Sequence, residues 1–381
     1  MDMKIIIASD SFKGCMTSNE ACENIKTGIL KANPHHKVAC FPMADGGEGT
    51  AQVLAAYANA KMVPVETIDL YKKPIEAHYG WNEESKLAII DVASCIGLNL
   101  YPKEKRNPMV ATSQGVGIMI QDAIDRGCKK ILIGLGGSGT NDGGMGILKA
   151  FGAIFYDKNR QELQDFAYSL DKIAYIDKKE FKFPQDIEWI VACDVKNHLC
   201  GPEGATCTFG KQKGLYISQL KTVDDAMRVY NQKIKQTFHV NMNELEGSGA
   251  AGGIGGVLLG VFKAQLIPGI QLAVEYSKLE SAMKDADLVI TGEGQTDRQT
   301  LYGKVPFGIA SLAKKHGVPA ICLSGALGMG YEELYNHGMI GIFSSSDRAM
   351  EFKTALRYGP EKLEKLAFSI IKLLDGWSNT K

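Results

Sequence analysis

A glycine-rich turn in the middle of the chain has the composition of a phosphate-binding site. After two lysines, the apolar residues 131–135 read as a short strand, and residues 136–144 after it contain five glycines, two hydroxyl residues and the carboxylate of Asp142. Glycines let backbone N–H groups approach an anion without obstruction by a Cβ atom, and Asp142 could hold the cation that accompanies a polyphosphate. The alternative is a strand-to-helix turn that needs glycine only for its positive φ angles.

Two further clusters place charged residues after apolar strands. An isoleucine-rich strand near the N-terminus leads to Asp10 and Lys13, a carboxylate and an ammonium that suit phosphoryl chemistry. Residues 38–43 lead in the same way to Asp45 and Glu48, which lie among glycines ahead of a helical segment. Each cluster alone could cap a helix, but capping does not require so many glycines beside so many acids. Because open α/β sheets bind ligands at the carboxyl ends of their strands, the three clusters together indicate a site.

The elements that position these clusters alternate between strands and helices, which predicts an α/β protein with mainly parallel sheet. Helices are expected at 18–31, 112–126, 218–238 and 306–316. Segment 286–294 repeats the N-terminal pattern of a strand that opens onto glycine and acid. We therefore predict a Rossmann-like domain with a doubly wound parallel sheet, built from residues 1–75 plus 280–381. Residues 76–279 are predicted to form a second, inserted α/β domain that is rich in glycine.

The composition is that of an ordinary globular protein without a preference for polyanions. Of 381 residues, 45% are hydrophobic, and 43 basic residues balance 43 acidic ones. Neither nucleic acid nor a membrane is therefore an expected partner. No uncharged apolar span is long enough to cross a bilayer, and the apolar stretch before Asp10 is too short for a signal peptide. We expect a cytoplasmic protein with a small-molecule partner.

The cysteines and a second glycine run add no clear chemistry. The nine cysteines are odd in number and lack a Cys-x-x-Cys motif, which favours reduced thiols over disulfides. Cys193, Cys200 and Cys207 cluster around His198, but their spacing matches no zinc motif. The run 247–256 either begins a tightly packed helix or lines a ligand, and the sequence favours neither.

Common nucleotide-binding and nucleophile motifs are absent. The chain has no Gly-x-x-x-x-Gly-Lys-[Ser/Thr] P-loop, and it lacks the His-Arg-Asp and Asp-Phe-Gly motifs of protein kinases. No Gly-x-Gly-x-x-Gly occurs in the setting of a nicotinamide site, and no glycine elbow surrounds a serine nucleophile. The phosphate-binding turn must therefore belong to another class of protein.

Ordered motifs run through nearly the whole chain. They occupy residues 10–14, 42–50, 107–108, 111–113, 136–138, 140–144, 201–202, 204–205, 249–253, 290–294, 297, 299–300 and 303–304. In this order they resemble the bacterial glycerate kinase family, which includes enzymes that form 2-phosphoglycerate. A succession of motifs is far more specific than any one of them.

This resemblance implies a two-domain kinase that uses ATP and Mg²⁺ to phosphorylate D-glycerate in the cleft between its domains. Phosphoryl transfer depends on positioning and charge neutralisation, which amide-rich turns, lysines and acids can provide. The residues expected to bind nucleotide phosphates are Gly136, Gly137, Ser138, Gly139, Thr140, Asn141 and Gly143. The expected metal ligands are Asp45, Glu48 and Asp142. The expected substrate-binding residues are Ser11, Gly46, Gly47 and Glu293.

The catalytic residues implied by the resemblance are two acids and two lysines. Asp10 and Asp194 each end an apolar strand and are the candidates for accepting the substrate's hydroxyl proton. Lys13 or Lys304 is expected to neutralise the transferred phosphoryl group or to pair with the carboxylate of glycerate. The alternatives are a kinase that gives 3-phosphoglycerate or acts on another small hydroxy acid, and a non-catalytic sensor of a phosphorylated metabolite.

Overall fold

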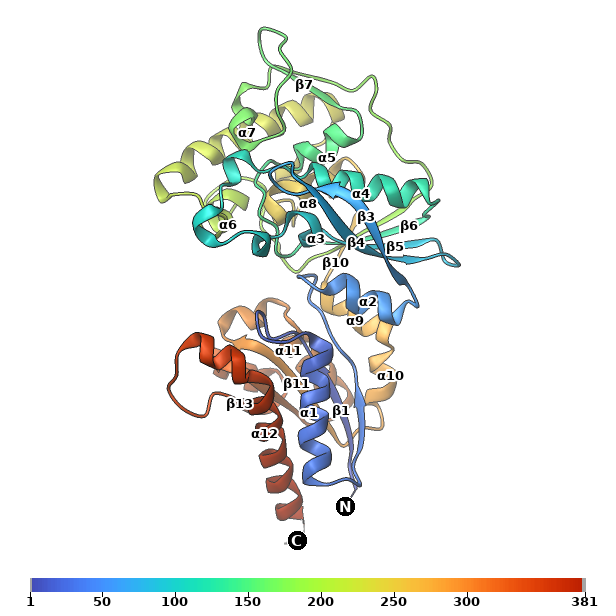
Figure 1. Cartoon of the computed structure of the whole chain (residues 1–381), viewed down its shortest axis with the longest axis vertical. Helices are drawn as coiled ribbons and strands as arrows, with labels where there is room; N and C mark the ends of the chain where they lie inside the picture. The colour runs from blue at the N-terminus through green and yellow to red at the C-terminus, as the bar shows by residue number, and fades with distance from the viewer. Residues whose placement is uncertain (1, 379–381) are drawn as a thin grey trace. The chain divides into compact units, whose positions relative to one another are not determined.

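The computed structural model describes residues 2–378 and confirms the expected α/β fold. Figure 1 labels its elements. The chain divides into two compact units: unit 1 contains Met1–Asp45 and Pro268–Lys381, and unit 2 contains Gly46–Ile267. The boundaries of these units thus differ from the positions near 75 and 280 that the sequence suggested.

Unit 1 is built on a five-stranded sheet in which all neighbouring strands are parallel. Its order is β13-β12-β11-β1-β2, with β1 Lys4–Ser9, β2 Lys37–Cys40, β11 Leu288–Thr296, β12 Ala320–Leu327 and β13 Met339–Ser344. The side chains of Ile5, Ile6 and Ile7 are fully buried because β1 lies inside the sheet. The chain adds β2 on one side of β1 and β11 on the other, and ligands bind where the winding of such a sheet reverses.

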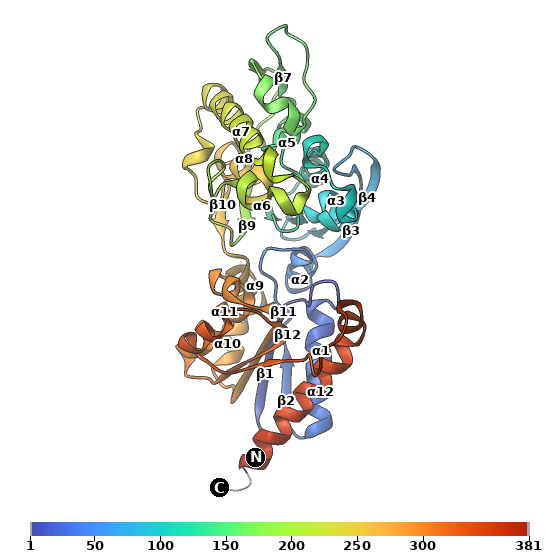
Figure 2. The ribbon, with the colours of Figure 1, turned by 90° about the vertical axis from the view of Figure 1, so that its left-hand side faces the viewer.

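Helices cover both faces of this sheet (Figure 2). On one face, α1 (Ser18–Ala32) packs along α12 (Phe352–Ser378), so closely that a Cβ atom at Gly28 would lie 2.2 Å from the carbonyl oxygen of Glu364. The other face carries α9 Gly269–Ser277, α10 Leu279–Met283 and α11 Val305–His316. Helix α1 begins at the predicted residue because Thr17 and Glu20 form a capping box.

Unit 2 contains a six-stranded mixed sheet of order β10-β9-β6-β5-β4-β3. Its parallel strands are β5 Leu87–Asp91, β6 Lys130–Gly134, β9 Glu188–Ala192 and β10 Gln265–Ile267, and the antiparallel hairpin of β3 Lys61–Ile68 and β4 Pro74–Asn82 extends it. Strand β3 pairs with β4 along its whole length, so residues 61–68 belong to this sheet. This pairing explains why the boundary between the units comes before residue 75.

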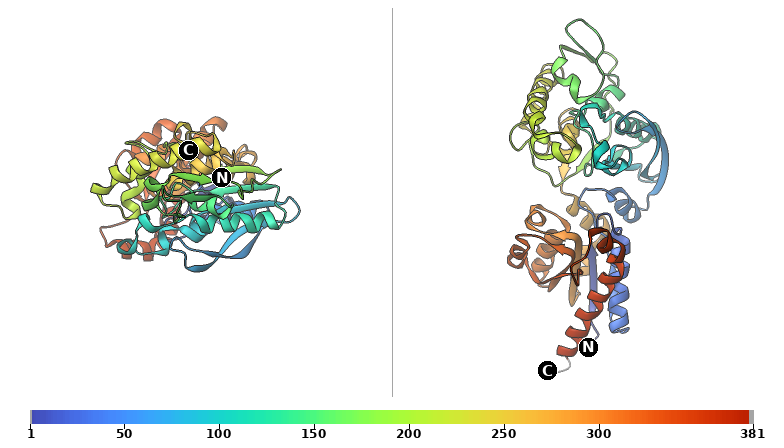
Figure 3. Two further views of the ribbon diagram at one scale, coloured as in Figure 1. Left: turned by 90° about the horizontal axis from the view of Figure 1, so that it is seen from above. Right: turned by 60° about the vertical axis from the view of Figure 1, so that its left-hand side comes forward.

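The helices of unit 2 position the glycine-rich segments. They are α2 Thr50–Tyr57, α3 Ala93–Ile96, α4 Gln114–Asp125, α5 Met145–Ala150, α6 Ala205–Lys213, α7 Ile217–Phe238 and α8 Ile254–Gly260, and β7 Ile154–Tyr156 pairs with β8 Tyr175–Asp177 in a small second sheet. Figure 3 (right) shows the yellow-green helices and the blue hairpin on opposite sides of this unit.

The glycine run 247–256 packs backbone against backbone. Gly252 has φ +68°, and a Cβ atom there would lie 2.1 Å from the carbonyl oxygen of Thr140. A Cβ atom at Gly253 would lie 2.5 Å from the Cα of Gly143. Of the two interpretations that the sequence left open, the structure therefore shows the tightly packed start of a helix, α8.

Three further features concern membranes, thiols and metals. Within residues 2–378, no helix is both long and apolar enough to cross a membrane. All nine cysteines are free thiols. In the same described range, no three His, Cys, Asp or Glu side chains gather closely enough to hold a metal ion without other ligands.

Candidate active site

In unit 1, three acidic residues lie near the carboxyl end of β1: Asp10 follows β1, Glu293 lies within the neighbouring β11, and Asp45 is on the segment after β2. The amide of Asp10 donates to the carbonyl oxygen of Gly292 at 2.9 Å, and Glu293 is the next residue of β11. The chain after β2 continues alongside β1, because the amide of Met43 donates to the last carbonyl of β1 at 2.9 Å. This path brings Asp45 near enough to Asp10 for the two carboxyl groups to repel each other. Asp45 and Glu293 therefore both act on Asp10, where the winding of the sheet reverses.

Asp10 has the electrostatic surroundings of a proton acceptor. Burial raises the pKa of Asp10 well above its usual range, and the negative charges of Asp45 and Glu293 raise it further. The amide of Ser11, 2.7 Å from Asp10 Oδ1, and the ammonium of Lys304 lower it in part. A carboxylate with a raised pKa takes up a proton more readily than an ordinary aspartate, which suits a general base.

Glu293 and Lys304 form a largely buried ion pair beside this carboxyl group. Glu293 is 4% exposed, and it accepts hydrogen bonds from the hydroxyls of Thr296 at 3.1 Å and Thr300 at 2.6 Å. Lys304 Nζ lies 3.3 Å from Glu293 Oε2. Burial lowers the pKa of Lys304, but the attraction of Glu293 outweighs this effect and leaves it raised. The ammonium is therefore held charged next to Asp10.

Ser11 and Lys13 lie in the loop after β1. Ser11 is half-buried and Lys13 is exposed. A Cβ atom at Gly294 would lie 3.2 Å from the amide nitrogen of Lys13, so the loops after β1 and β11 pass close together. Of the two lysines that the sequence pointed to, Lys304 is the one in contact with the acidic cluster.

Mg²⁺ fits the donor atoms present in unit 1. Protein sites usually bind Mg²⁺ through one or two carboxylates, and water and substrate phosphates complete its shell. Asp45 is half-buried and repels Asp10, and a cation between carboxylates would relieve this repulsion. The observation is compatible with the predicted metal role of Asp45.

In unit 2, two glycine-rich turns meet at the carboxyl ends of three parallel strands. The register places Asp91, Gly134 and Ala192 side by side at the ends of β5, β6 and β9. The amide of Gly136 donates to the carbonyl oxygen of Gly46 at 2.9 Å. A Cβ atom at Gly136 would lie 2.3 Å from the Cα atom of Gly47. The predicted substrate-binding glycines 46 and 47 thus pack on the predicted phosphate turn.

The phosphate turn has an accessible half and a buried half. Gly136 and Gly137 are partly exposed, whereas residues 138–144 are buried. In the buried half, the amide of Gly139 donates to the carbonyl oxygen of Ile96 at 2.8 Å, and the amide of Gly143 donates to the carbonyl oxygen of Gly252 at 2.9 Å. No hydrogen bond within the described residues occupies the amides of residues 137 and 138. The amide of Gly137 is the donor that the accessible part of the turn can offer to an anion, and the amide of Ser138, a residue that is 4% exposed, lies at the edge of the buried part. Direct contacts from Gly139, Thr140, Asn141 and Gly143 stay predictions that burial disfavours.

Asp142 organises the start of two helices. Its carboxylate is fully buried and accepts hydrogen bonds from the amide and hydroxyl of Ser113, at 2.8 and 2.7 Å, and from the amides of Gly144 and Gly146, at 3.2 and 3.1 Å. Burial raises the pKa of Asp142, and these donors partly oppose the shift. Four donors already surround the carboxylate, so we favour a role in fixing the turn over the predicted contact with a metal ion.

Glu48 and Asp194 are the remaining predicted acids. Glu48 is exposed, and it accepts a hydrogen bond from Asn99 Nδ2 at 2.6 Å. Asp194 is half-buried and follows the carboxyl end of β9. Both acids therefore lie near the strand ends that carry the glycine turns, and their predicted roles in metal binding and proton transfer stay predictions.

Two residues that the sequence analysis missed stand out. Asp91 Oδ2 accepts hydrogen bonds from the amides of Gly49 and Ala51, at 3.1 and 3.0 Å, and so fixes the turn before α2. An acid at the end of an apolar strand is a signal that could have identified it. Lys213 is buried and donates hydrogen bonds into the phosphate turn. Nothing in the sequence around Lys213 reveals these contacts, because Ser138 and Thr140 are 75 and 73 residues away along the chain.

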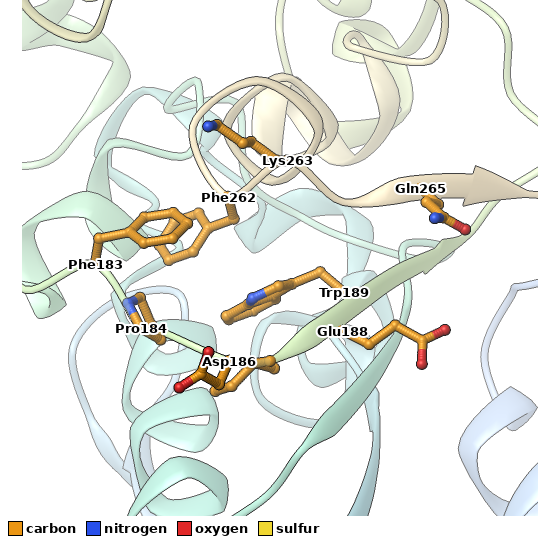
Figure 4. Close-up of a pocket in the computed structure, with 9 residues that line it drawn as sticks. Phe183, Pro184, Asp186, Glu188, Trp189, Phe262, Lys263 and Gln265 are labelled. Atoms are coloured by element: carbon orange, nitrogen blue, oxygen red, sulfur yellow. The ribbon is translucent and has the colours of Figure 1, made fainter.

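A cavity of about 380 Å³ lies at the other end of β9 (Figure 4). Its walls include the rings of Phe183 and Phe262, which stack with centroids 6.1 Å apart, and the indole of Trp189. Trp189 is the second residue of β9, whereas Asp194 comes two residues after the last one, Ala192. The cavity is therefore separate from the strand ends that carry the glycine turns and the acids.

Comparison with known proteins gives one consistent result. The model of the glycerate kinase family matches residues 5–375. A glycerate kinase of Halalkalibacterium halodurans is 38% identical over 99% of both chains, and the glycerate 2-kinase of Escherichia coli is 39% identical over 90% of both. A crystal structure described as a glycerate kinase 2 from Salmonella typhimurium LT2 covers all of both chains, with a TM-score of 0.83 and 36% identity.

Proposed function

The chain belongs to the glycerate kinase family, and on that premise we propose that it transfers the terminal phosphoryl group of ATP to the 2-hydroxyl of D-glycerate. The products are 2-phosphoglycerate and ADP. The observation that carries this proposal is the raised pKa of Asp10. Its carboxyl group lies beside Lys304, at the place where the winding of a parallel sheet reverses. Family membership makes the chain an enzyme, so the interpretation as a non-catalytic sensor is set aside.

The proposed step needs a proton acceptor at the substrate hydroxyl. The hydroxyl oxygen forms a bond to the γ-phosphorus, and the bond from that phosphorus to the β,γ-bridging oxygen breaks with its electron pair leaving on ADP. The hydroxyl proton passes to a carboxylate, for which Asp10 is the first candidate. Its raised pKa supports this role, because burial and nearby negative charge favour the protonated product of the transfer. Asp194 is the second candidate.

Charge neutralisation is assigned to residues of both units. Lys304 is held charged by Glu293 and is available to the transferred phosphoryl group or to the carboxylate of glycerate. The amides of Gly137 and Ser138 are proposed to bind nucleotide phosphates, because neither has a partner within the described residues. Mg²⁺, held through Asp45 with Glu48 as an alternative, would neutralise phosphate charge when bound.

The experiment that tests the function is product analysis. The purified protein is incubated with ATP, MgCl₂ and D-glycerate, and the phosphorylated product is identified by ³¹P and ¹H NMR against both phosphoglycerates. L-Glycerate and glycolate serve as parallel substrates. We expect 2-phosphoglycerate from D-glycerate, formed in step with ADP. Formation of 3-phosphoglycerate alone would overturn the choice of hydroxyl, and no product from D-glycerate would overturn the substrate.

A further inference from the structure

Lys213 is the last residue of α6 and is 3% exposed. The following residue, Gly214, has φ +112°, and a Cβ atom there would lie 2.3 Å from the carbonyl oxygen of Arg106. This close contact fixes the end of α6 and with it the start of the lysine side chain. A lysine at the carboxyl end of a helix also complements the partial negative charge there.

The ammonium of Lys213 donates to two groups of the phosphate turn. It lies 2.7 Å from the carbonyl oxygen of Thr140 and 3.2 Å from Ser138 Oγ. Both acceptors are neutral. In the described part of the chain no acidic side chain lies within ion-pair distance of Lys213. The charge of Asp142 acts on it from farther away and only partly offsets the cost of burying an ammonium.

The same turn contains buried polar atoms without a partner in the described residues. Thr140 and Asn141 are fully buried, and neither Thr140 Oγ1 nor Asn141 Oδ1 has a hydrogen-bond partner. The amides of residues 137 and 138 are also unoccupied, as described above. A buried cation without an ion-pair partner, next to amides and polar atoms that lack hydrogen-bond partners among the described residues, is the arrangement expected of a site whose ligand is an anion.

We infer that Lys213 provides the positive charge of the phosphate turn: it holds Ser138 and Thr140 in place and attracts nucleotide phosphate at the amides of residues 137 and 138. This inference rests on the proposed binding of nucleotide to that turn. Lys213 is a positioning residue, because it acts through Ser138 and Thr140 and from beneath the accessible surface. The competing explanation is that Lys213 only holds the turn in place through its hydrogen bonds and has no electrostatic role.

Electrostatics gives a way to separate the two explanations. Burial lowers the pKa of Lys213 to about 7, and Asp142 opposes the shift. The other charged groups near this end of α6 are Lys211 on the helix itself and Arg106, whose guanidinium donates to the carbonyl oxygen of Gln212. An anion bound at the turn would raise the pKa of Lys213, so nucleotide binding should be accompanied by proton uptake above neutral pH.

The test is calorimetric titration of ATP at about pH 8 in two non-phosphate buffers that differ in ionisation enthalpy. The proteins compared are the unmodified chain, Lys213→Met and Lys211→Met. Methionine keeps the length of the stem but removes the charge and the donors. Lys211 is exposed on the same helix and serves as the matched control.

We expect the unmodified chain and Lys211→Met to take up a large fraction of a proton on binding ATP and Lys213→Met to take up none. Loss of a charged hydrogen-bond donor should weaken ATP binding by Lys213→Met about tenfold to a hundredfold. The ratio of the two dissociation constants should shrink as the pH rises from about 6.5 to about 8.5. If Lys213 only held the turn in place, Lys213→Met would bind ATP with a different affinity but with the same proton uptake as the unmodified chain.

The outcomes distinguish this inference from the function on which it rests. If the unmodified chain binds ATP without proton uptake, or if Lys213→Met matches it in both quantities, the electrostatic role is wrong and the proposed kinase reaction is untouched. If the unmodified chain fails to bind ATP, both are overturned. The proton measurement on the unmodified chain does not depend on whether Lys213→Met folds.

Discussion

The two units handle buried charge in opposite ways. In unit 1, Glu293 is paired with Lys304, and the negative charges of Asp45 and Glu293 act on the carboxyl group of Asp10 and raise its pKa. In unit 2, Asp142 accepts hydrogen bonds from one hydroxyl and three amides, and the ammonium of Lys213 donates only to neutral groups of the phosphate turn. An excess of carboxylate suits proton transfer and cation binding, whereas an ammonium among amides suits an anion. The difference suggests a division of tasks, with acid–base chemistry in unit 1 and phosphate binding in unit 2.

The largest effect should follow from removing the carboxylate of Asp10. Asp10→Asn keeps the size and the hydrogen-bonding capacity of the side chain but cannot accept the substrate proton. We expect kcat to fall by roughly two to four orders of magnitude with little change in KM for glycerate. Steady-state kinetics of Asp10→Asn and Asp194→Asn would compare the two candidate bases directly. Near-normal turnover of Asp10→Asn would remove Asp10 from the base role.

The accessible half of the phosphate turn should be the next most sensitive region. Gly137 has φ +75°, and a Cβ atom there would lie 3.3 Å from the Cβ of Ala93, so Gly137→Ala must move the backbone that carries the free amides. Loss of one charged hydrogen bond predicts ATP binding weakened by about tenfold or more.

Gly127→Ala is the matched control for Gly137→Ala. Gly127 has φ +85° with nothing within 4 Å of the added Cβ, so alanine meets comparable backbone strain without disturbing the turn. Both variants should lose some thermal stability, but only Gly137→Ala should bind ATP more weakly. Equal ATP affinity in the two folded variants would assign the turn at residue 137 to structure alone.

Substitutions of the predicted metal ligands Asp45 and Glu48 should differ in their effect on the Mg²⁺ requirement, because the two acids have different surroundings. Asp45 lies near the carboxyl group of Asp10, whereas Glu48 is exposed and accepts a hydrogen bond from Asn99. We expect Asp45→Asn to raise the Mg²⁺ concentration for half-maximal rate by about tenfold or more, with partial rescue at excess metal. Glu48→Gln should change it less. The exposed acid Asp285 provides a control through Asp285→Asn, and Mg²⁺ curves that coincide for all three variants would exclude both acids as ligands.

The sequence allowed local features to be predicted better than long-range ones. The parallel strands and the helices that begin near residues 18, 217 and 305 follow local apolar patterns, and the structure contains them. The proximity of Asp10 after β1 and Glu293 in β11 was predictable because parallel strands of one sheet share their carboxyl edge. The pairing of β3 with β4 was missed, because assigning residues 46–75 to one unit requires knowing which sheet they join.

Burial decides the parts of the site that the sequence could not resolve. Residues 136–144 form one continuous motif in sequence, but the fold exposes its first residues and packs the rest against the glycines that precede α8. For the same reason, Asp142 looked like a metal ligand until its donors were known. Lys213 reaches the turn from a helix far away in the chain, and no local pattern marks a lysine that points inward.

The smallest predicted effect concerns the stability of unit 2 and tests whether Lys213 is an uncompensated buried charge. In the unfolded chain a lysine has its usual pKa of about 10.4, whereas burial lowers the pKa of Lys213 to about 7 in the folded protein. Between these values the unfolded state holds a proton that the folded state has lost, so this group makes the protein more stable as the pH rises. Below about pH 7 both states hold the proton, and the destabilisation reaches its full size. From pH 7.5 to 9 the free energy of unfolding should therefore increase by about 1 to 2 kcal/mol more in the unmodified chain than in Lys213→Met.

Urea unfolding at the two pH values would measure this difference, with Lys211→Met expected to behave like the unmodified chain. Parallel changes in all three proteins would show that Lys213 keeps an ordinary pKa, and the contrast between the two units would then lose its electrostatic basis.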